Sequence, residues 1–219
     1  MKLQIKWIPV AAILAIVALA GEASIVIEPP ADDYRVPPNR SMQEEQSLLI
    51  DDFSSRDGLS YFKTRWRMFT DRVMGGISSA NYTYEDIDGR SCLRLTGKVS
   101  LANNGGFIQV ALPLEKKERS LDAGIYTGVR LQVWGNGEDY HVHLRTRTTR
   151  MPWQFYQGSF PTVAGEWSMV EIPFDRFRGQ GIRSPLETGR LTRIAVVAIK
   201  KEFQADIAIS RLEFYRQAD

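Results

Sequence analysis

The sequence predicts an all-β fold, a mostly antiparallel sandwich or jelly roll, on three observations. About eleven short strand-like runs follow one another from Leu48 onward, separated by glycine, asparagine, aspartate or proline. Several of these runs alternate apolar and polar residues, as a strand with one buried face requires. Helical periodicity is almost absent. Many short strands without intervening helices are typical of a sandwich or jelly roll.

The predicted strands are taken in chain order. They span residues 48–53, 61–70, 79–85, 91–100, 107–114, 127–134, 140–148, 153–160, 167–174, 191–199 and 206–214. The clearest alternation lies in the run 127–134, where Val129, Leu131 and Val133 fall on one face. That face is predicted to point into the core of the sandwich.

Two segments precede the predicted domain, which occupies residues 48–215. Residues 1–20 have the order of a secretory signal peptide, with two lysines, an apolar run and a small-residue cleavage pattern. The apolar run is shorter than the roughly 20 residues of a membrane span, and an uncleaved anchor is the alternative. Residues 21–47 are rich in proline and polar residues and are predicted to be a disordered tether.

This leader predicts an exported protein, either periplasmic or anchored to the outer face of the inner membrane. Contact with the membrane is expected only through an uncleaved leader. Loss of Lys2 and Lys6 with the leader leaves equal numbers of basic and acidic residues, so nucleic acid is not an expected partner.

Cys92 is the only cysteine. An intramolecular disulfide is therefore excluded, and Cys92 is predicted to be a small core or sheet residue.

Four motifs in the predicted domain resemble one known family. They read DRVMGGIS at 71–78, NNGGF at 103–107, WGNGEDY at 134–140 and EWSMVEIPFDRF at 166–177. In this order they resemble the complex I intermediate-associated protein 30 family, over about residues 48–215. The resemblance implies a galactose-binding-like β-sandwich and a non-catalytic assembly factor that acts through protein contacts.

The export signal departs from the family's mitochondrial members, which carry a transit peptide. Assembly of complex I on the matrix side corresponds to the bacterial cytoplasm, so the expected partner is instead a protein of an envelope or respiratory complex. The wider superfamily often binds carbohydrate, which makes a glycan-binding module the alternative. The sequence contains no GxSxG elbow, P-loop or dinucleotide fingerprint. We therefore predict no catalytic residue, no cofactor and no metal, with an undetected hydrolase as a third hypothesis.

Counting strand reversals predicts that several glycine-rich loops meet at one end of the sandwich. The pairs Gly75-Gly76 and Gly105-Gly106 are expected there, together with Gly137 and the loops near residues 164–165 and 200–201. The turn at 88–89 and the long loop 175–190 are expected at the other end. Asn104-Gly105 has the composition of a type I′ hairpin turn. The loop 175–190 is either a partner-docking segment or a solvated excursion.

The motif DRVMGG at this end has two interpretations. In the structural one, Met74 plugs the core, the glycines permit a tight reversal, and Asp71 pairs with Arg72 or caps a turn. In the functional one, the glycines let a ligand approach the backbone while polar side chains offer hydrogen bonds. The candidate binding residues at this end are Asp71, Arg72, Met74, Gly75, Gly76, Asn104, Gly105, Gly106, Phe107, Asn136 and Asp139.

A second candidate surface is the polar face of the run 140–148, which carries His141 and His143. Two histidines on one strand face suit a metal, with Glu138 or Asp139 as a further ligand. The same face, joined by Trp134 and by Trp153, suits a sugar platform, because aromatic rings stack on sugars while His and Arg donate hydrogen bonds. The plain alternative is the solvated face of a half-buried strand.

Overall fold

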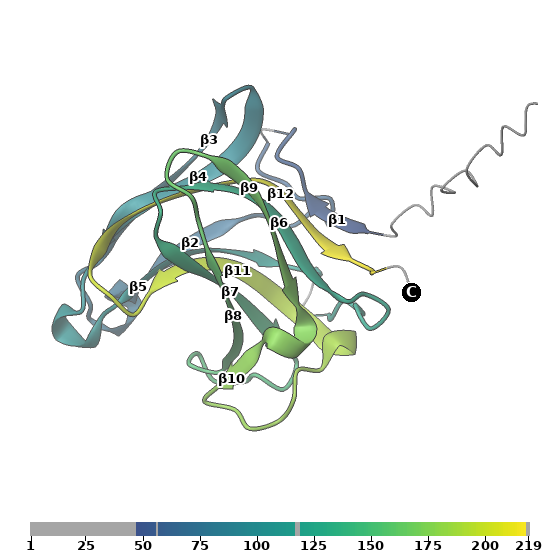
Figure 1. Cartoon of the computed structure of the whole chain (residues 1–219). Coiled ribbons are helices and arrows are strands. Elements are labelled where there is room, and N and C mark those ends of the chain that lie inside the picture. The colour runs from purple at the N-terminus through teal and green to yellow at the C-terminus, as the bar shows by residue number, and fades with distance from the viewer. Residues whose placement is uncertain (1–46, 56, 117–118, 218–219) are drawn as a thin grey trace, which may run out of the picture. The chain divides into compact units, whose positions relative to one another are not determined.

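The computed structural model describes residues 47–55, 57–116 and 119–217. The predicted signal peptide and all but the last residue of the predicted tether lie outside this part of the chain. The described residues contain twelve strands, four short 3-10 turns and no α-helix, so the prediction of an all-β sandwich is confirmed (Figure 1). Within these residues no helix is long and apolar enough to span a membrane.

The strands form two antiparallel sheets of six strands each, which we call the β12 sheet and the β11 sheet after their central strands. The β12 sheet has the order β3-β4-β12-β6-β9, and β1 pairs with β12 beyond the end of β4. Its strands are β1 (Leu48–Asp51), β3 (Ser79–Ile87), β4 (Arg90–Val99), β6 (Gly128–Gly135), β9 (Trp167–Pro173) and β12 (Phe203–Tyr215).

The β11 sheet has the order β10-β8-β7-β11-β5-β2. Its strands are β2 (Arg67–Thr70), β5 (Phe107–Pro113), β7 (Asp139–Thr146), β8 (Phe155–Pro161), β10 (Arg178–Gln180) and β11 (Leu191–Ile199). The 3-10 turns are η1 (Asp71–Met74), η2 (Ala102–Asn104), η3 (Phe174–Arg176) and η4 (Thr188–Arg190).

The core forms where the apolar faces of the two sheets meet. Val129, Leu131 and Val133 are fully buried in it, as their alternation predicts. Each such side chain contributes about 1.5 to 3 kcal/mol by leaving water. Cys92 is also buried, as predicted, and burial raises the pKa of its thiol to about 11. The thiol is therefore protonated at neutral pH.

Each of the eleven predicted runs contains a strand, and two details of that prediction are wrong. The first strand of the β11 sheet covers only Arg67–Thr70 of the run 61–70. The loop 175–190 holds an unpredicted edge strand, β10, which pairs with β8. Its three residues, RGQ, are too few to show alternation, so only long-range pairing defines the strand.

The predicted hairpin at Asn104-Gly105 is also wrong. Strands β4 and β5 lie in different sheets, so residues 100–106 cross the sandwich instead of reversing between paired strands. Positive φ occurs at Asn103 (57°) and Gly106 (131°), whereas Gly105 has φ −74°. The turn at Asp88-Gly89 does have positive φ at both residues and joins β3 to β4, as a type I′ turn requires.

The predicted convergence of loops at one end is confirmed. The segment before β5 and the turn between β11 and β12 lie side by side at the left of Figure 1. Hydrogen bonds join the loops: Gly106 N to the Asp71 carboxyl (2.6 Å), Lys200 N to Gly106 O (3.1 Å), Asn136 Nδ2 to Gln204 O (2.7 Å) and Gly165 N to Gly135 O (2.9 Å). Strand β9 begins opposite Trp134 and ends opposite Gly128, so the loop that follows it lies at the other end, as predicted.

Candidate functional site

Asp71 is the centre of the convergent end, and it is fully buried. Its carboxylate accepts hydrogen bonds from Ser78 N (3.0 Å), from the Ser78 hydroxyl and from Gly106 N (2.6 Å), with a longer contact from Phe107 N (3.4 Å). Burial alone raises the pKa of a carboxyl, but these donors outweigh it and lower the pKa of Asp71. Asp71 is therefore an internal clamp between the loops 71–78 and 100–106, and its expected role toward a ligand is not supported.

The glycines of the two motifs make room for this clamp. A β-carbon at Gly76 or at Gly105 would fall on the Asp71 carboxyl. Gly75 ends η1 with φ 91°, a left-handed conformation that side chains other than glycine and asparagine seldom adopt. The glycine pairs are thus explained by the packing of the loops around a carboxylate.

The apolar residues of these loops point outward. The exposed fractions are 73% for Val73, 59% for Met74, 54% for Ile77 and 48% for Leu101. The interpretation of Met74 as a plug of the core is therefore wrong. We call these four residues the apolar tip. The DRVMGG motif has the reverse of the expected polarity, with its carboxylate inside and its thioether outside.

The other candidate residues at this end differ in exposure and in their hydrogen bonds. Arg72 is exposed and its Nε donates to Ser78 O (3.2 Å) instead of pairing with Asp71. Asn136 donates to Gln204 O and accepts from the Tyr140 hydroxyl (2.8 Å), so its amide is engaged within the fold. Phe107 is half-buried and Asp139 is exposed. Asn104 lies in η2, and its side chain is outside the described part of the structure.

The predicted platform of Trp134 with the two histidines is wrong. Trp134 lies on β6 in the β12 sheet, whereas His141 and His143 lie on β7 in the β11 sheet. The connection between these strands crosses from one sheet to the other, which strand alternation cannot reveal. Trp134 instead lies directly opposite Trp167 on the β12 sheet, with the Arg94 guanidinium 5.2 Å from its ring centre.

His143 is buried, not solvated. It is 7% exposed and its ring stacks on Phe155 with centroids 3.9 Å apart. Burial lowers the pKa of His143 to about 3, with a further contribution from His141. His141 accepts or donates a 2.8 Å hydrogen bond with the Ser159 hydroxyl. No three His, Cys, Asp or Glu residues of the described chain are grouped as a metal ion would require.

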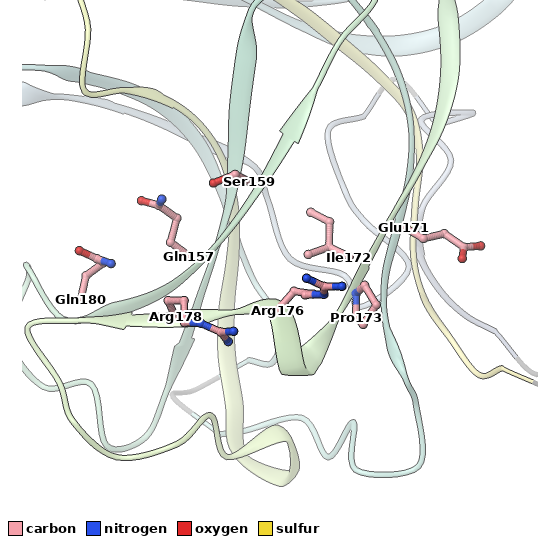
Figure 2. A pocket seen from close by; sticks show the side chains of 8 residues that line it. All are labelled: Gln157, Ser159, Glu171, Ile172, Pro173, Arg176, Arg178 and Gln180. Carbon is pink, nitrogen blue, oxygen red and sulfur yellow. The ribbon is translucent and has the colours of Figure 1, made fainter.

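An open hollow of about 620 Å³ lies between β9 and the edge strands of the β11 sheet. Figure 2 shows the labelled residues of β8 on one side and those of β9 on the other, with residues of η3 and β10 below them. The Gln157 side-chain oxygen is buried beside His143. The lining residues are Gln157, Ser159, Glu171, Ile172, Pro173, Arg176, Arg178 and Gln180. Part of the loop 175–190 thus forms a wall of a polar hollow.

Comparison with family models decides the family. The model described as complex I intermediate-associated protein 30 matches residues 52–209. The chain belongs to this family. The sequence motifs therefore identified the family correctly. A search of the curated proteins found no match.

Solved structures similar to this member of the family include carbohydrate-binding modules. A family 11 module from Clostridium thermocellum, solved with a β-1,3-1,4-mixed-linked tetrasaccharide, has a TM-score of 0.60 at 11% identity, over 79% of this chain and 97% of the module. A family 30 module of a cellulosomal cellulase from Clostridium thermocellum has a TM-score of 0.52 at 14% identity, over 80% and 99%. At these identities the likeness shows the fold alone, a galactose-binding-like jelly roll.

Sequence reasoning missed three of the four residues of the apolar tip. It selected Met74 but not Val73, Ile77 or Leu101. A signal was present, because three apolar residues within 73–77 surround two glycines and do not follow strand alternation. Residues with this spacing do not share one face of a strand, so a strand could not bury all three.

Proposed function

We propose that this protein is a non-catalytic binding module of the assembly-factor type, which docks on a protein partner of an envelope or respiratory complex through the apolar tip. The observation that carries the proposal is the exposure of Val73, Met74 and Ile77 on loops that a buried carboxylate holds together. Family membership supports this type of function.

The chemistry of the tip favours a protein partner over a sugar. Recognition of sugars relies on side chains that hydrogen-bond to sugar hydroxyls, and the exposed side chains of the apolar tip are aliphatic or thioether groups. Exposed aliphatic and methionine side chains rimmed by polar groups are typical of protein interfaces. The Asp71 clamp fixes the loops before binding, which reduces the entropy lost when the partner docks.

A photo-crosslinking amino acid placed at Met74 tests this proposal in the native host. The matched control is Met169, a methionine of similar exposure (53%) on the outer face of β9. We expect crosslinks at position 74 to one membrane-associated protein complex, and none to that complex at position 169. Equal crosslinking at both positions, or none at position 74, would contradict the proposal.

Binding of the purified protein to protein-free lipid vesicles separates docking on a protein from insertion into a membrane. We expect no vesicle binding by the wild-type protein or by Met74→Ser. Vesicle binding that Met74→Ser abolishes would contradict a protein partner.

Export is part of this proposal, since the partner is placed in the cell envelope. We propose that the mature chain begins near Gly21, after a leader with the charge and apolar order of a signal peptide. Intact-mass measurement on protein from the native host tests this. A mass that includes Met1 would exclude cleavage.

A glycan is the second candidate ligand, and the polar hollow of Figure 2 favours it. Gln157, Ser159 and Gln180 offer amide and hydroxyl groups of the kind that bind sugar hydroxyls. The tetrasaccharide bound by the family 11 module supports the same reading. A glycan array with wild-type protein and Gln157→Ala tests it. Sugar binding that this substitution weakens is expected, and absence of binding to all glycans would reject it.

A further inference from the structure

A second hollow, of about 610 Å³, lies over the outer face of the β11 sheet at the end away from the apolar tip. Its volume falls within the roughly 300–1,000 Å³ typical of sites for small molecules. Among the described residues, seven basic side chains and one carboxylate, that of Glu115, line it. The lining residues are Lys63, Thr64, Arg65, Arg67, Pro113, Glu115, Lys116, Arg119, Arg145, Thr149, Thr192 and Arg193.

Two half-buried arginines form the floor of this hollow. Arg145 on β7 lies directly opposite Arg193 on β11. Like charges in directly opposite positions of neighbouring strands destabilise a sheet. Burial lowers the pKa of Arg145, and Arg193 lowers it further; burial and Arg67 act in the same way on Arg193.

The fold holds these guanidinium groups without neutralising them. Arg145 Nη2 donates to the carbonyl oxygens of Thr149 (2.7 Å) and Met151 (2.9 Å), which are uncharged acceptors. The Arg193 guanidinium lies 5.8 Å from the ring centre of Phe69. Within the described chain neither arginine forms an ion pair with a carboxylate. The two guanidinium groups are therefore held in place, and no described carboxylate pairs with either of them.

We propose that this hollow binds a small ligand that carries two or more oxyanion groups, such as phosphates, sulfates or carboxylates. Guanidinium groups form paired hydrogen bonds with such groups, and partial burial strengthens those bonds. Cations from several separate segments line the hollow, so more than one anionic group is accommodated. The site is separate from the apolar tip and from the hollow of Figure 2.

Calorimetric titration with tripolyphosphate and with a sulfated heparin-derived disaccharide tests the proposal, with cellobiose as an uncharged control. We expect at least one of the two anions to bind at a single site, more weakly as salt rises, and cellobiose not to bind there. The tighter of the two anions identifies the source as phosphate or as an acidic sugar. Failure of both anions to bind at millimolar concentration would overturn the proposal.

Three variants make the test specific. Arg193→Gln is expected to weaken anion binding at least tenfold without lowering the melting temperature of the anion-free protein, since it removes a repulsion. Arg67→Gln, on the exposed rim, is a second variant that leaves the floor intact and is also expected to weaken binding. Arg183→Gln, an exposed arginine outside the hollow, is the matched control. An equal loss of binding in the control would overturn the proposal.

Discussion

The charge of Asp71 lies in an environment opposite to that of the charges of Arg145 and Arg193. The Asp71 carboxylate is fully buried, and backbone and hydroxyl donors of two loops satisfy it. The two arginines are half-buried and directly opposite each other, and no carboxylate of the described chain pairs with them. A charge that the fold satisfies stabilises the fold. A charge that the fold positions without an ion-pair partner is available to a ligand of opposite charge.

Removal of the satisfied charge has the largest expected effect on stability. Asp71→Ala leaves the buried donors of Ser78 and Gly106 without an acceptor, and we expect a loss of about 3 kcal/mol or more in the free energy of unfolding. Chemical denaturation monitored by tryptophan fluorescence measures it. Asp71→Asn keeps one acceptor oxygen and should lose less. A loss below about 1 kcal/mol for the alanine variant would show that the clamp is not what holds the loops.

Adding a side chain next to the Asp71 carboxyl is a second test of how the two loops pack. Gly76→Ala places a methyl group on the Asp71 carboxyl, and we expect a cost of about 2 kcal/mol from overpacking. Gly75→Asn is the matched control, because no atom lies near its β-carbon position and asparagine tolerates its left-handed φ. Equal thermal melts of the two variants would contradict the role assigned to Gly76.

We expect the buried His143 to make the free energy of unfolding depend on pH, with an effect of intermediate size. The pKa of His143 is about 3 in the folded protein, below the roughly 6.5 of an unfolded chain. The unfolded state therefore binds more protons below pH 6.5, and stability falls as pH drops from 6.5 toward 3. The limiting slope for one group is about 1.4 kcal/mol per pH unit.

Denaturation at several pH values measures this slope, and His143→Phe should flatten it. His141 contributes in the same direction, because burial also lowers its pKa. Asp71 also has a lowered pKa, but its contribution is lost only below its unfolded value of 3.8. Burial raises the pKa of Asp51, which acts in the opposite direction in this range, so the difference in slope between the wild-type protein and His143→Phe reports the histidine. An unchanged slope in His143→Phe would count against burial of the neutral ring.

The strands were predictable from the sequence, but their assignment to sheets was not. Alternation depends on neighbouring residues, and it located every strand except β10. Membership of a sheet depends on pairing between distant segments. Both β4 to β5 and β6 to β7 cross between sheets, and the sequence does not distinguish these crossings from hairpins. The separation of Trp134 from the histidines follows from that limit.

The loops of the candidate site were correctly predicted to meet at one end, but the sequence did not predict which of their residues are buried. Hydrophobicity places Met74 inside and Asp71 outside, whereas the structure does the reverse. The reversal depends on Gly76 and Gly105, which come from two loops and leave space for the same carboxyl. The basic hollow was hidden for a similar reason, because its cations come from separate segments and the net charge is close to neutral.

The smallest expected effect belongs to the apolar tip. A buried methionine would cost about 2 to 5 kcal/mol on truncation to alanine. Because Met74 is 59% exposed, we expect Met74→Ala to change the free energy of unfolding by less than about 0.5 kcal/mol. Thermal and chemical denaturation against the matched variant Met169→Ala measures the difference. A loss above about 2 kcal/mol at position 74 alone would restore the plug interpretation and would contradict the proposed docking surface. A negligible loss, together with reduced crosslinking to the partner complex, separates binding from folding at the residue where the two interpretations of DRVMGG disagree.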